Sequence, residues 1–359
     1  MWYNVIRFIQ EMTCKLRKLH QKQKQWLLAK SKTAIKRLQK KNKYKLKRKN
    51  NIYTGKRSKK ERRVFLSVPK IFSITNNPNE TLDFFNGVYD IIEKLTFKEE
   101  IYFNLYDVNI ITVDAIMYLI ALIKNTKRLK VLQINCSGNI PQSESARKVI
   151  ETSGFYNYVS PQYKVENTVN SNINISSGYE ADPELVGGIC DFVHKNSLLD
   201  RIDTKPLFPM IMELMTNTKQ HAYSNNDTVK SKWYIFVENS DKQIQFVFLD
   251  TGEGIPNTIR RDFFEKIRSM VTNSDAFFIS SALKGAFRTE TEQGHRGKGF
   301  PEIYNRISER SISDFTIVSC CGKCDVEDDG NIHETKLSSG LRGSLFYWKL
   351  NKSKKENKI

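Results

Sequence analysis

The sequence has no continuous apolar run of the roughly 20 residues that a membrane-spanning helix requires. Residues 1–10 lack the apolar core and cleavage site of a secretory signal. The six cysteines are irregularly spaced along 359 residues, so they do not suggest a disulfide framework, and no internal repeat is visible. We therefore expect a cytoplasmic protein without membrane spans, disulfides or repeats.

Acidic residues are nearly missing from one part of the chain. Residues 1–63 hold 23 lysines and arginines but only two acids, Glu11 and Glu61. The rest of the chain holds 35 basic and 37 acidic residues, so the net charge of +19 comes from this basic arm. Its apolar residues are loosely spaced as in a helix up to about Gln39, and residues 40–63 are too charged to bury a core. We expect a helical or disordered arm.

The basic arm leaves three interpretations open. It could be a solvated tail. It could bind nucleic acid, which is favoured by Trp2, Trp26, Tyr44 and Tyr53 interleaved with basic residues. It could bind an anionic membrane surface if its first helix is amphipathic, which is the least favoured partner.

Residues 64–165 predict a compact α/β domain. Apolar runs predict strands at 64–68, 101–105 and 131–135, and helical spacing predicts helices at 79–94, from Thr112 onward and at 143–153. Strands that alternate with helices indicate a parallel or mixed sheet. An Asn- and Ser-rich linker is expected at 166–183, a second domain at 184–350 and a basic tail at 351–359.

The spacing of several polar residues and glycines in the second domain suggests a binding site. Glu213 and Asn217 are four apart in a helix predicted at 206–222, so they share one face. Asp250 follows two strands predicted at 233–249, and Gly252 and Gly254 follow it, which lets backbone approach a flat ring closely. A later turn, Gly294-His295-Arg296-Gly297-Lys298-Gly299, can point its N–H groups at phosphates.

This ordered set resembles the GHKL superfamily of gyrase-type ATPases, heat-shock-type chaperones, histidine kinases and anti-sigma serine kinases. The resemblance covers 184–350 and implies an α/β sandwich with a helix layer on a mixed sheet, a mobile lid at 257–293, and a site for ATP and Mg²⁺. It implies that Glu213 is catalytic, that Asn217 binds the metal and that Asp250 hydrogen-bonds the adenine amino group. The other implied cofactor-binding residues are Gly252, Gly254, Gly294, Arg296, Gly297, Lys298, Gly299 and Ser344.

Residues 101–155 resemble a STAS domain, the fold of anti-anti-sigma factors, through the strand, the Ile111-Thr112-Val113-Asp114-Ala115 turn and its helix. Phosphorylatable STAS proteins place Ser or Thr directly after this Asp. Ala115 has no hydroxyl, so the resemblance implies a STAS-like domain that is not phosphorylated there, unless Thr112 substitutes.

Two classes of function remain open for the whole chain. One is an enzyme, either an ATPase or a protein serine/threonine kinase. The other is a nucleotide-gated binding switch, and both imply an unidentified protein partner, with a homodimer as a further option. A zinc site at Cys320, Cys321 and Cys324 with His333 is less favoured, because a single CxxC with one distant His lacks the paired spacing of zinc fingers.

Overall fold

The structure is a computed structural model that describes residues 63–159, 172–197, 204, 206–220, 231–262, 273–286, 301, 304–305 and 312–352. These residues belong to one compact unit, Glu61–Ile359. The basic arm before Arg63 and the tail after residue 352 lie outside the described residues. Within the described part of the chain, no helix is long and apolar enough to cross a membrane. The expected α/β class is confirmed.

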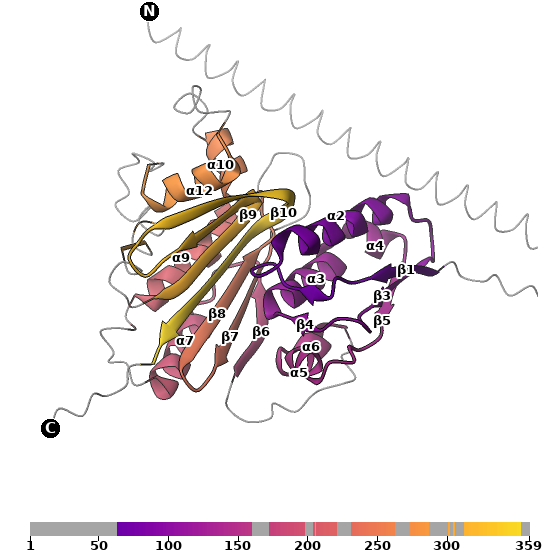
Figure 1. Cartoon of the computed structure of the whole chain (residues 1–359), viewed down its shortest axis with the longest axis horizontal. Coiled ribbons are helices and arrows are strands. Elements are labelled where there is room, and N and C mark those ends of the chain that lie inside the picture. The colour runs from indigo at the N-terminus through magenta and orange to yellow at the C-terminus, as the bar shows by residue number, and fades with distance from the viewer. Residues whose placement is uncertain are drawn as a thin grey trace, which may run out of the picture. The chain divides into compact units, whose positions relative to one another are not determined.

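The N-terminal layer is built on parallel strands (Figure 1). One sheet has the order β1-β3-β5, and a second sheet pairs β2 with β4. The strands are β1 (Arg63–Ser67), β2 (Ile71–Phe72), β3 (Glu100–Asn104), β4 (Ile110–Ile111) and β5 (Asn135–Gly138). The helices are α2 (Pro78–Lys94), α3 (Val113–Asn125), α4 (Lys127–Val131), α5 (Glu144–Thr152) and α6 (Phe155–Val159).

A local sequence signal accounts for the start of α5. Ser143 caps α5, because its hydroxyl accepts the N–H of Ala146. Helix α3 is apolar on nearly all sides and is buried from Val113 to Leu122. The strand predicted at 131–135 is wrong: residue 131 ends α4, and β5 begins only at Asn135. Short apolar runs do not distinguish a strand from a buried helical turn.

The C-terminal layer is a five-stranded sheet with the order β6-β7-β8-β10-β9. Its strands are β6 (Asn172–Gly178), β7 (Trp233–Asn239), β8 (Gln243–Asp250), β9 (Ser313–Val326) and β10 (Ile332–Asn351). Its helices are α7 (Pro183–Asn196), α9 (Leu207–Gln220), α10 (Ile255–Asp262) and α12 (Asp275–Leu283). Within this five-stranded sheet, every described strand pair is antiparallel. The expectation of a mixed sheet is therefore wrong.

The region expected to be a linker contributes a strand. Residues 172–178 form β6, which pairs with β7 at the edge of the sheet. The side chain of Trp233 lies across Gly178, where an added Cβ would be 2.4 Å from the indole ring. Asn and Ser composition suggested a loop here, but pairing with β7 supplies the backbone partners that make a strand stable.

Both faces of this sheet are buried, and alternate residues divide between them. Trp233, Ile235 and Val237 pack in the cluster that includes α7, α9 and α12. Tyr234 and Phe236, which alternate with them, pack in the cluster of the N-terminal layer. The sheet is therefore the middle of a structure whose helices cover one face and whose N-terminal layer covers the other.

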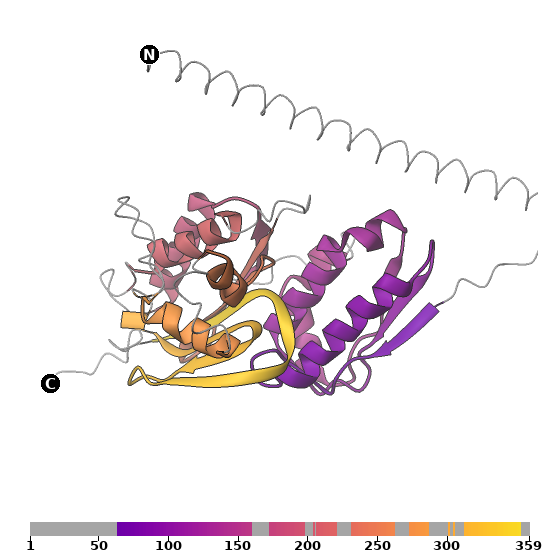
Figure 2. The same cartoon turned by 90° about the horizontal axis from the view of Figure 1, so that it is seen from above.

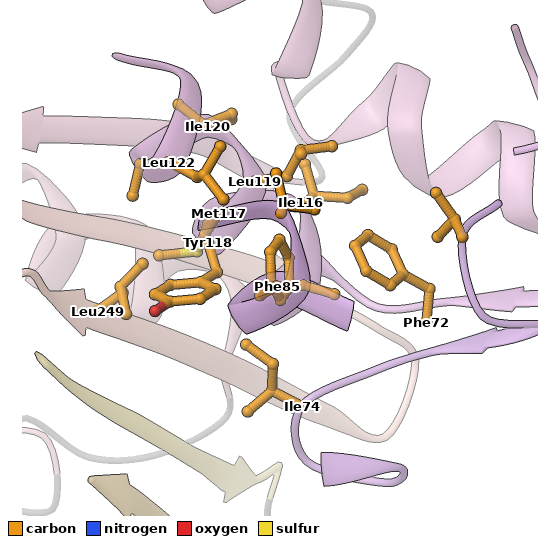
Figure 3. Close-up of a cluster of buried hydrophobic side chains, with 14 of the residues drawn as sticks. Phe72, Ile74, Phe85, Ile116, Met117, Tyr118, Leu119, Ile120, Leu122 and Leu249 are labelled. Carbon is orange, nitrogen blue, oxygen red and sulfur yellow. The ribbon is translucent and has the colours of Figure 1, made fainter. Parts of the chain in front are cut away.

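The junction between the two layers is dense (Figure 3). Tyr118 of α3 meets Phe85 of α2 edge-on with ring centroids 4.6 Å apart, and Leu249 of β8 lies in the same cluster. Farther along, Asn86 donates to the backbone oxygen of Gly340 on β10 at 3.1 Å. The predicted STAS-like and ATP-binding domains thus share one hydrophobic core.

The expected lid also contains a core element. Within residues 257–293, Ala276, Ile279 and Leu283 of α12 are almost fully buried under the sheet. The thiol of Cys324 donates to the backbone oxygen of Ala276 at 3.2 Å, which ties α12 to β9. The α12 part of this connection is therefore packed structure; residues 263–272 and 287–300 lie outside the described residues.

Removing the N-terminal layer should destabilise the C-terminal sheet. A fragment of residues 172–352 would expose apolar side chains that are now buried against the N-terminal layer, including Phe236 and Leu249. We expect this fragment to bind a hydrophobic dye and to lack a cooperative thermal transition. A fragment of residues 63–352 is the control and should melt cooperatively without dye binding. Equal melting behaviour of the two fragments would contradict a shared core.

Candidate nucleotide-binding site

Asp250 ends β8 at a point where three strands meet. In the sheet register it lies opposite Trp233 of β7 and Ser344 of β10. Phe246 and Phe248 of β8 face the helices, and because side chains alternate along a strand, Asp250 points to the same face. The carboxylate therefore lies on the sheet face that α7, α9 and α12 cover.

The surroundings of Asp250 are polar and partly buried. Its Oδ1 accepts the N–H of Gly252 at 2.8 Å. Burial raises the pKa of the Asp250 carboxyl to about 6, and hydrogen bonds from Gly252 and Ser344 oppose this rise. A raised pKa means that ionisation costs folding free energy, so this group's contribution to stability is largest at low pH and is lost as pH rises through about 6.

Two glycines with positive φ allow the backbone to close around Asp250. Gly343 has φ of +112°, and an added Cβ would lie 2.0 Å from the backbone oxygen of Asp250. Gly254 has φ of +87°, and an added Cβ would lie 2.7 Å from the sulfur of Cys320. A side chain at either position would force strands or loop apart, so glycine is required there.

Ser319 joins the pieces around Asp250, and the sequence analysis did not identify it. Its fully buried hydroxyl accepts the N–H of Ile255 at 3.0 Å and donates to the backbone oxygen of Gly343 at 2.9 Å. It also lies 3.1 Å from the hydroxyl of Ser344. A serine inside the apolar run of β9 was the available signal, because buried hydroxyls need partners.

Glu213 and Asn217 lie on α9, as the sequence predicts. Burial raises the pKa of the Glu213 carboxyl, and a hydrogen bond with Asn217 lowers it in part. An ionised carboxylate only accepts hydrogen bonds, so the amide nitrogen of Asn217 is the donor. This leaves the amide oxygen as the end that suits a hard cation such as Mg²⁺.

The structure brings the expected residues together as two groups. Gly252 and Ser344 each contact Asp250, and Glu213 contacts Asn217. Helix α9 packs on the same sheet face toward which Asp250 points, through residues such as Ile211 and Met215. The two groups therefore lie on the same side of the sheet, with Glu213 and Asn217 on the half-buried flank of α9 that is turned away from Ile211 and Met215.

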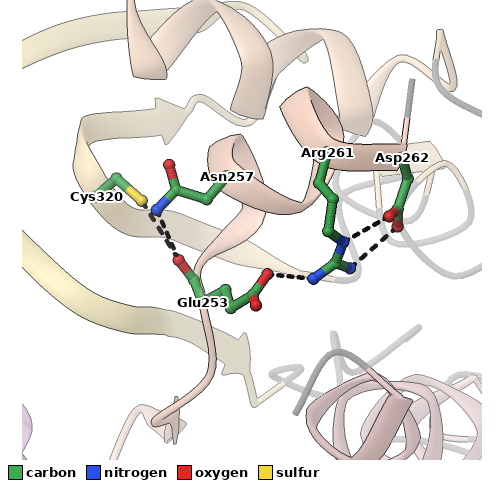
Figure 4. A network of polar contacts seen from close by, with 5 residues as sticks. All are labelled: Glu253, Asn257, Arg261, Asp262 and Cys320. Atoms are coloured by element: carbon green, nitrogen blue, oxygen red, sulfur yellow. Dashed lines mark hydrogen bonds and ion pairs between the residues drawn. The ribbon is translucent and has the colours of Figure 1, made fainter. Parts of the chain in front are cut away.

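The loop after Asp250 is held by a polar network (Figure 4). The backbone oxygen of Glu253 accepts the amide of Asn257 at 3.0 Å and lies 3.7 Å from the sulfur of Cys320. The side chain of Glu253 pairs with Arg261, which also binds Asp262. These contacts fix the loop containing Gly252 and Gly254 to both ends of α10.

Contacts from the N-terminal layer reach the same loop and strand. The amide of Asn125, at the end of α3, lies 3.5 Å from the hydroxyl of Thr251, beside Asp250. The hydroxyl of Tyr118 accepts the N–H of Arg342 at 3.0 Å, two residues before Ser344. Helix α3 therefore contacts both segments that flank Asp250.

The remaining predicted residues lie outside the described residues. These are the residues of the glycine turn: Gly294, Arg296, Gly297, Lys298 and Gly299. Their roles stay predictions.

The start of α3 holds the STAS-like residues. The buried carboxylate of Asp114 accepts the N–H groups of Thr75 and Ala115 and a hydrogen bond from the hydroxyl of Thr112. Ala115 is fully buried. A cavity of about 870 Å³ opens beside Thr112 and Asp114, against the sheet face opposite Asp250. It is therefore separate from the candidate nucleotide site.

The cysteines of β9 are held apart. Cys324 donates to Ala276, whereas Cys320 lies against Glu253. Burial raises the pKa of Cys320 to about 11 and that of Cys324 to about 12, which disfavours thiolate formation. In the part of the chain that the structure describes, no group of three or more His, Cys, Asp or Glu residues could hold a metal ion.

Comparisons of the sequence with protein-family models and with curated proteins found no match. Any inference about function therefore rests on the chain's own residues and their contacts.

Proposed function

We propose that residues 172–352 bind Mg-ATP and that the N-terminal layer regulates this site without being phosphorylated at position 115. The observation that carries the proposal is the placement of the Asp250 carboxylate. Its carboxylate ends a buried strand on the helix-covered face and is braced by Gly252 and Ser344. A partly buried acceptor beside glycine backbone suits an exocyclic amino group on a flat base.

The donor set on α9 fits the other end of the ligand. Asn217 would bind Mg²⁺ through its amide oxygen, because Mg²⁺ prefers oxygen ligands and bridges phosphates. Glu213, with its raised pKa, would accept a proton from an attacking hydroxyl or water. ATP would supply the transferable phosphoryl group, and the glycine turn at 294–299 would contact its phosphates.

Two activities follow from this site. An ATPase or serine/threonine kinase is supported by the Glu213 carboxylate beside Asn217. The contacts of α3 with Thr251 and Arg342 support a nucleotide-gated switch, whose affinity for a protein or nucleic-acid partner would change when nucleotide binds. Incubating the full chain with γ-labelled ATP and Mg²⁺ separates them: free phosphate indicates an ATPase, labelled protein a kinase, and binding without turnover a switch.

Asp250→Asn should weaken ATP binding roughly 10- to 100-fold, because the charged acceptor becomes a neutral amide that accepts at one oxygen only. The wild-type advantage should hold above pH 6 and disappear below it, since protonation turns the carboxylate into a poorer acceptor near its pKa of about 6. Calorimetric titration of both proteins across the pH range measures this, and their ratio cancels the titration of ATP itself. A ratio that does not change with pH would remove Asp250 from the site.

Glu213→Gln and Asn217→Ala should separate chemistry from binding. Glu213→Gln keeps the shape and the hydrogen-bonding capacity but removes the base, so turnover should fall about 100-fold or more with ATP affinity kept. Asn217→Ala should lose the part of ATP affinity that depends on Mg²⁺. Single-turnover phosphate release and binding with and without Mg²⁺ test both. Normal turnover by Glu213→Gln would show that Glu213 is not the base.

Tyr118→Phe should weaken ATP binding although Tyr118 lies in the N-terminal layer. The change removes the hydroxyl that accepts the Arg342 N–H and keeps the ring. We expect ATP affinity to fall about fivefold or more. This corresponds to a coupling free energy of about 1 kcal/mol, the lower end of the usual range. Tyr158→Phe is the matched control, because the Tyr158 hydroxyl donates to Ile175 of the edge strand β6. Equal ATP affinity in the two variants would argue against coupling through Tyr118.

A further inference from the structure

Within the described residues, no helix or strand covers one face of the parallel sheet of the N-terminal layer. Val64, Leu66, Ile101 and Phe103 pack inward against the core cluster. The alternate residues of β1 and β3 point the other way, and in Figure 2 the helices of this layer lie on one side of its strands. Parallel sheets normally have both faces covered, so a bare face needs an explanation.

An aromatic pair lies on this bare face. Phe65 and Tyr102 are opposite each other in the β1–β3 register, and their ring centroids are 5.2 Å apart. Phe65 is 66% exposed, the largest exposure among the exposed large hydrophobic side chains of the described residues. Exposing a phenylalanine ring to water on a sheet is costly, which favours a partner that covers it.

A cation is fixed over these rings. The guanidinium of Arg63 lies 5.9 Å from the ring centroid of Phe65 and 5.4 Å from that of Tyr102. Arg63 also pairs with Glu100 at 2.7 Å, and Glu100 accepts a hydrogen bond from Ser137. These hydrogen bonds, that of Ser137 first, lower the pKa of Glu100, so the carboxylate stays ionised and keeps Arg63 in place.

The segment that precedes β1 in the sequence is strongly basic. Arg63, the first residue of β1, is the last of the 23 lysines and arginines in residues 1–63. The patch itself is nearly neutral, because Arg63 and Glu100 pair. Long-range attraction of a polyanion would therefore come from the segment before β1, and local binding would come from the rings.

We propose that this face, formed by Arg63, Phe65 and Tyr102, binds single-stranded RNA by stacking bases on its rings. Proteins that bind single strands combine a positively charged track for the backbone with aromatic rings for the bases. Strands that present aromatic rings on an open sheet face are a common solution for RNA. The polar side chains beside the rings, Ser67, Asn104 and Ser137, suit contacts with ribose hydroxyls, which DNA lacks.

The test uses the full chain and a fluorescein-labelled oligoadenylate longer than the 4–16 nucleotides that one single-strand site typically covers, read by fluorescence anisotropy. Phe65→Ala and Tyr102→Ala should each lower affinity about tenfold. Phe65→Leu keeps an apolar side chain but has no ring, and it should lose nearly as much. Phe208→Ala, at a phenylalanine of α9 that is 39% exposed, is the matched control and should bind as wild type.

A salt series separates stacking from charge. Removing a ring removes no phosphate contact, so the slope of log affinity against log salt should stay the same while affinity falls. Wild-type affinity in the Phe65→Ala, Tyr102→Ala double variant would overturn the proposal even if RNA binds elsewhere. Equal binding of the corresponding oligodeoxyadenylate would overturn the choice of RNA. Loss of self-association instead of RNA binding in Phe65→Ala would assign the face to a second copy of the chain.

Discussion

Burial of both faces of the five-stranded antiparallel sheet is the constraint on which the rest of the structure depends. Trp233 and Ile235 require helices on one face, whereas Tyr234 and Phe236 require the N-terminal layer on the other. A sheet that is apolar on both sides cannot stand alone in water. The two layers are therefore parts of one structural unit rather than domains on a flexible tether.

In this arrangement the N-terminal layer packs on the sheet face opposite the candidate site. Asp250 points toward the helices, while Tyr118 and Asn125 of α3 contact residues within two positions of Asp250 or Ser344. A displacement of α3 would reach the carboxylate through backbone that Gly343 packs tightly. Packed interfaces transmit displacement because they have few voids to absorb it. Under our proposal, the N-terminal layer would influence nucleotide binding without touching the nucleotide.

The N-terminal layer also has a surface that the nucleotide site does not use. The bare face of β1 and β3 presents Phe65 and Tyr102 beside Arg63, and it is distinct from the face that packs against the core. Under our two proposals, one layer would join a nucleotide site on one side to an RNA surface on the other. The sheet residues between them, such as Phe103 and Leu249, belong to one continuous core.

The sequence by itself determined the α/β class, the helical spacing of Glu213 and Asn217, and the strand that ends in Asp250, because these depend on local periodicity and turn chemistry. Residues 172–178 read as a linker, since strand pairing with β7 is not encoded locally. The sequence also did not show that Ser319 would connect Ile255 to Gly343, or that Tyr118 would accept the N–H of Arg342. Those contacts join residues far apart in the chain, and only tertiary packing brings them within hydrogen-bonding distance.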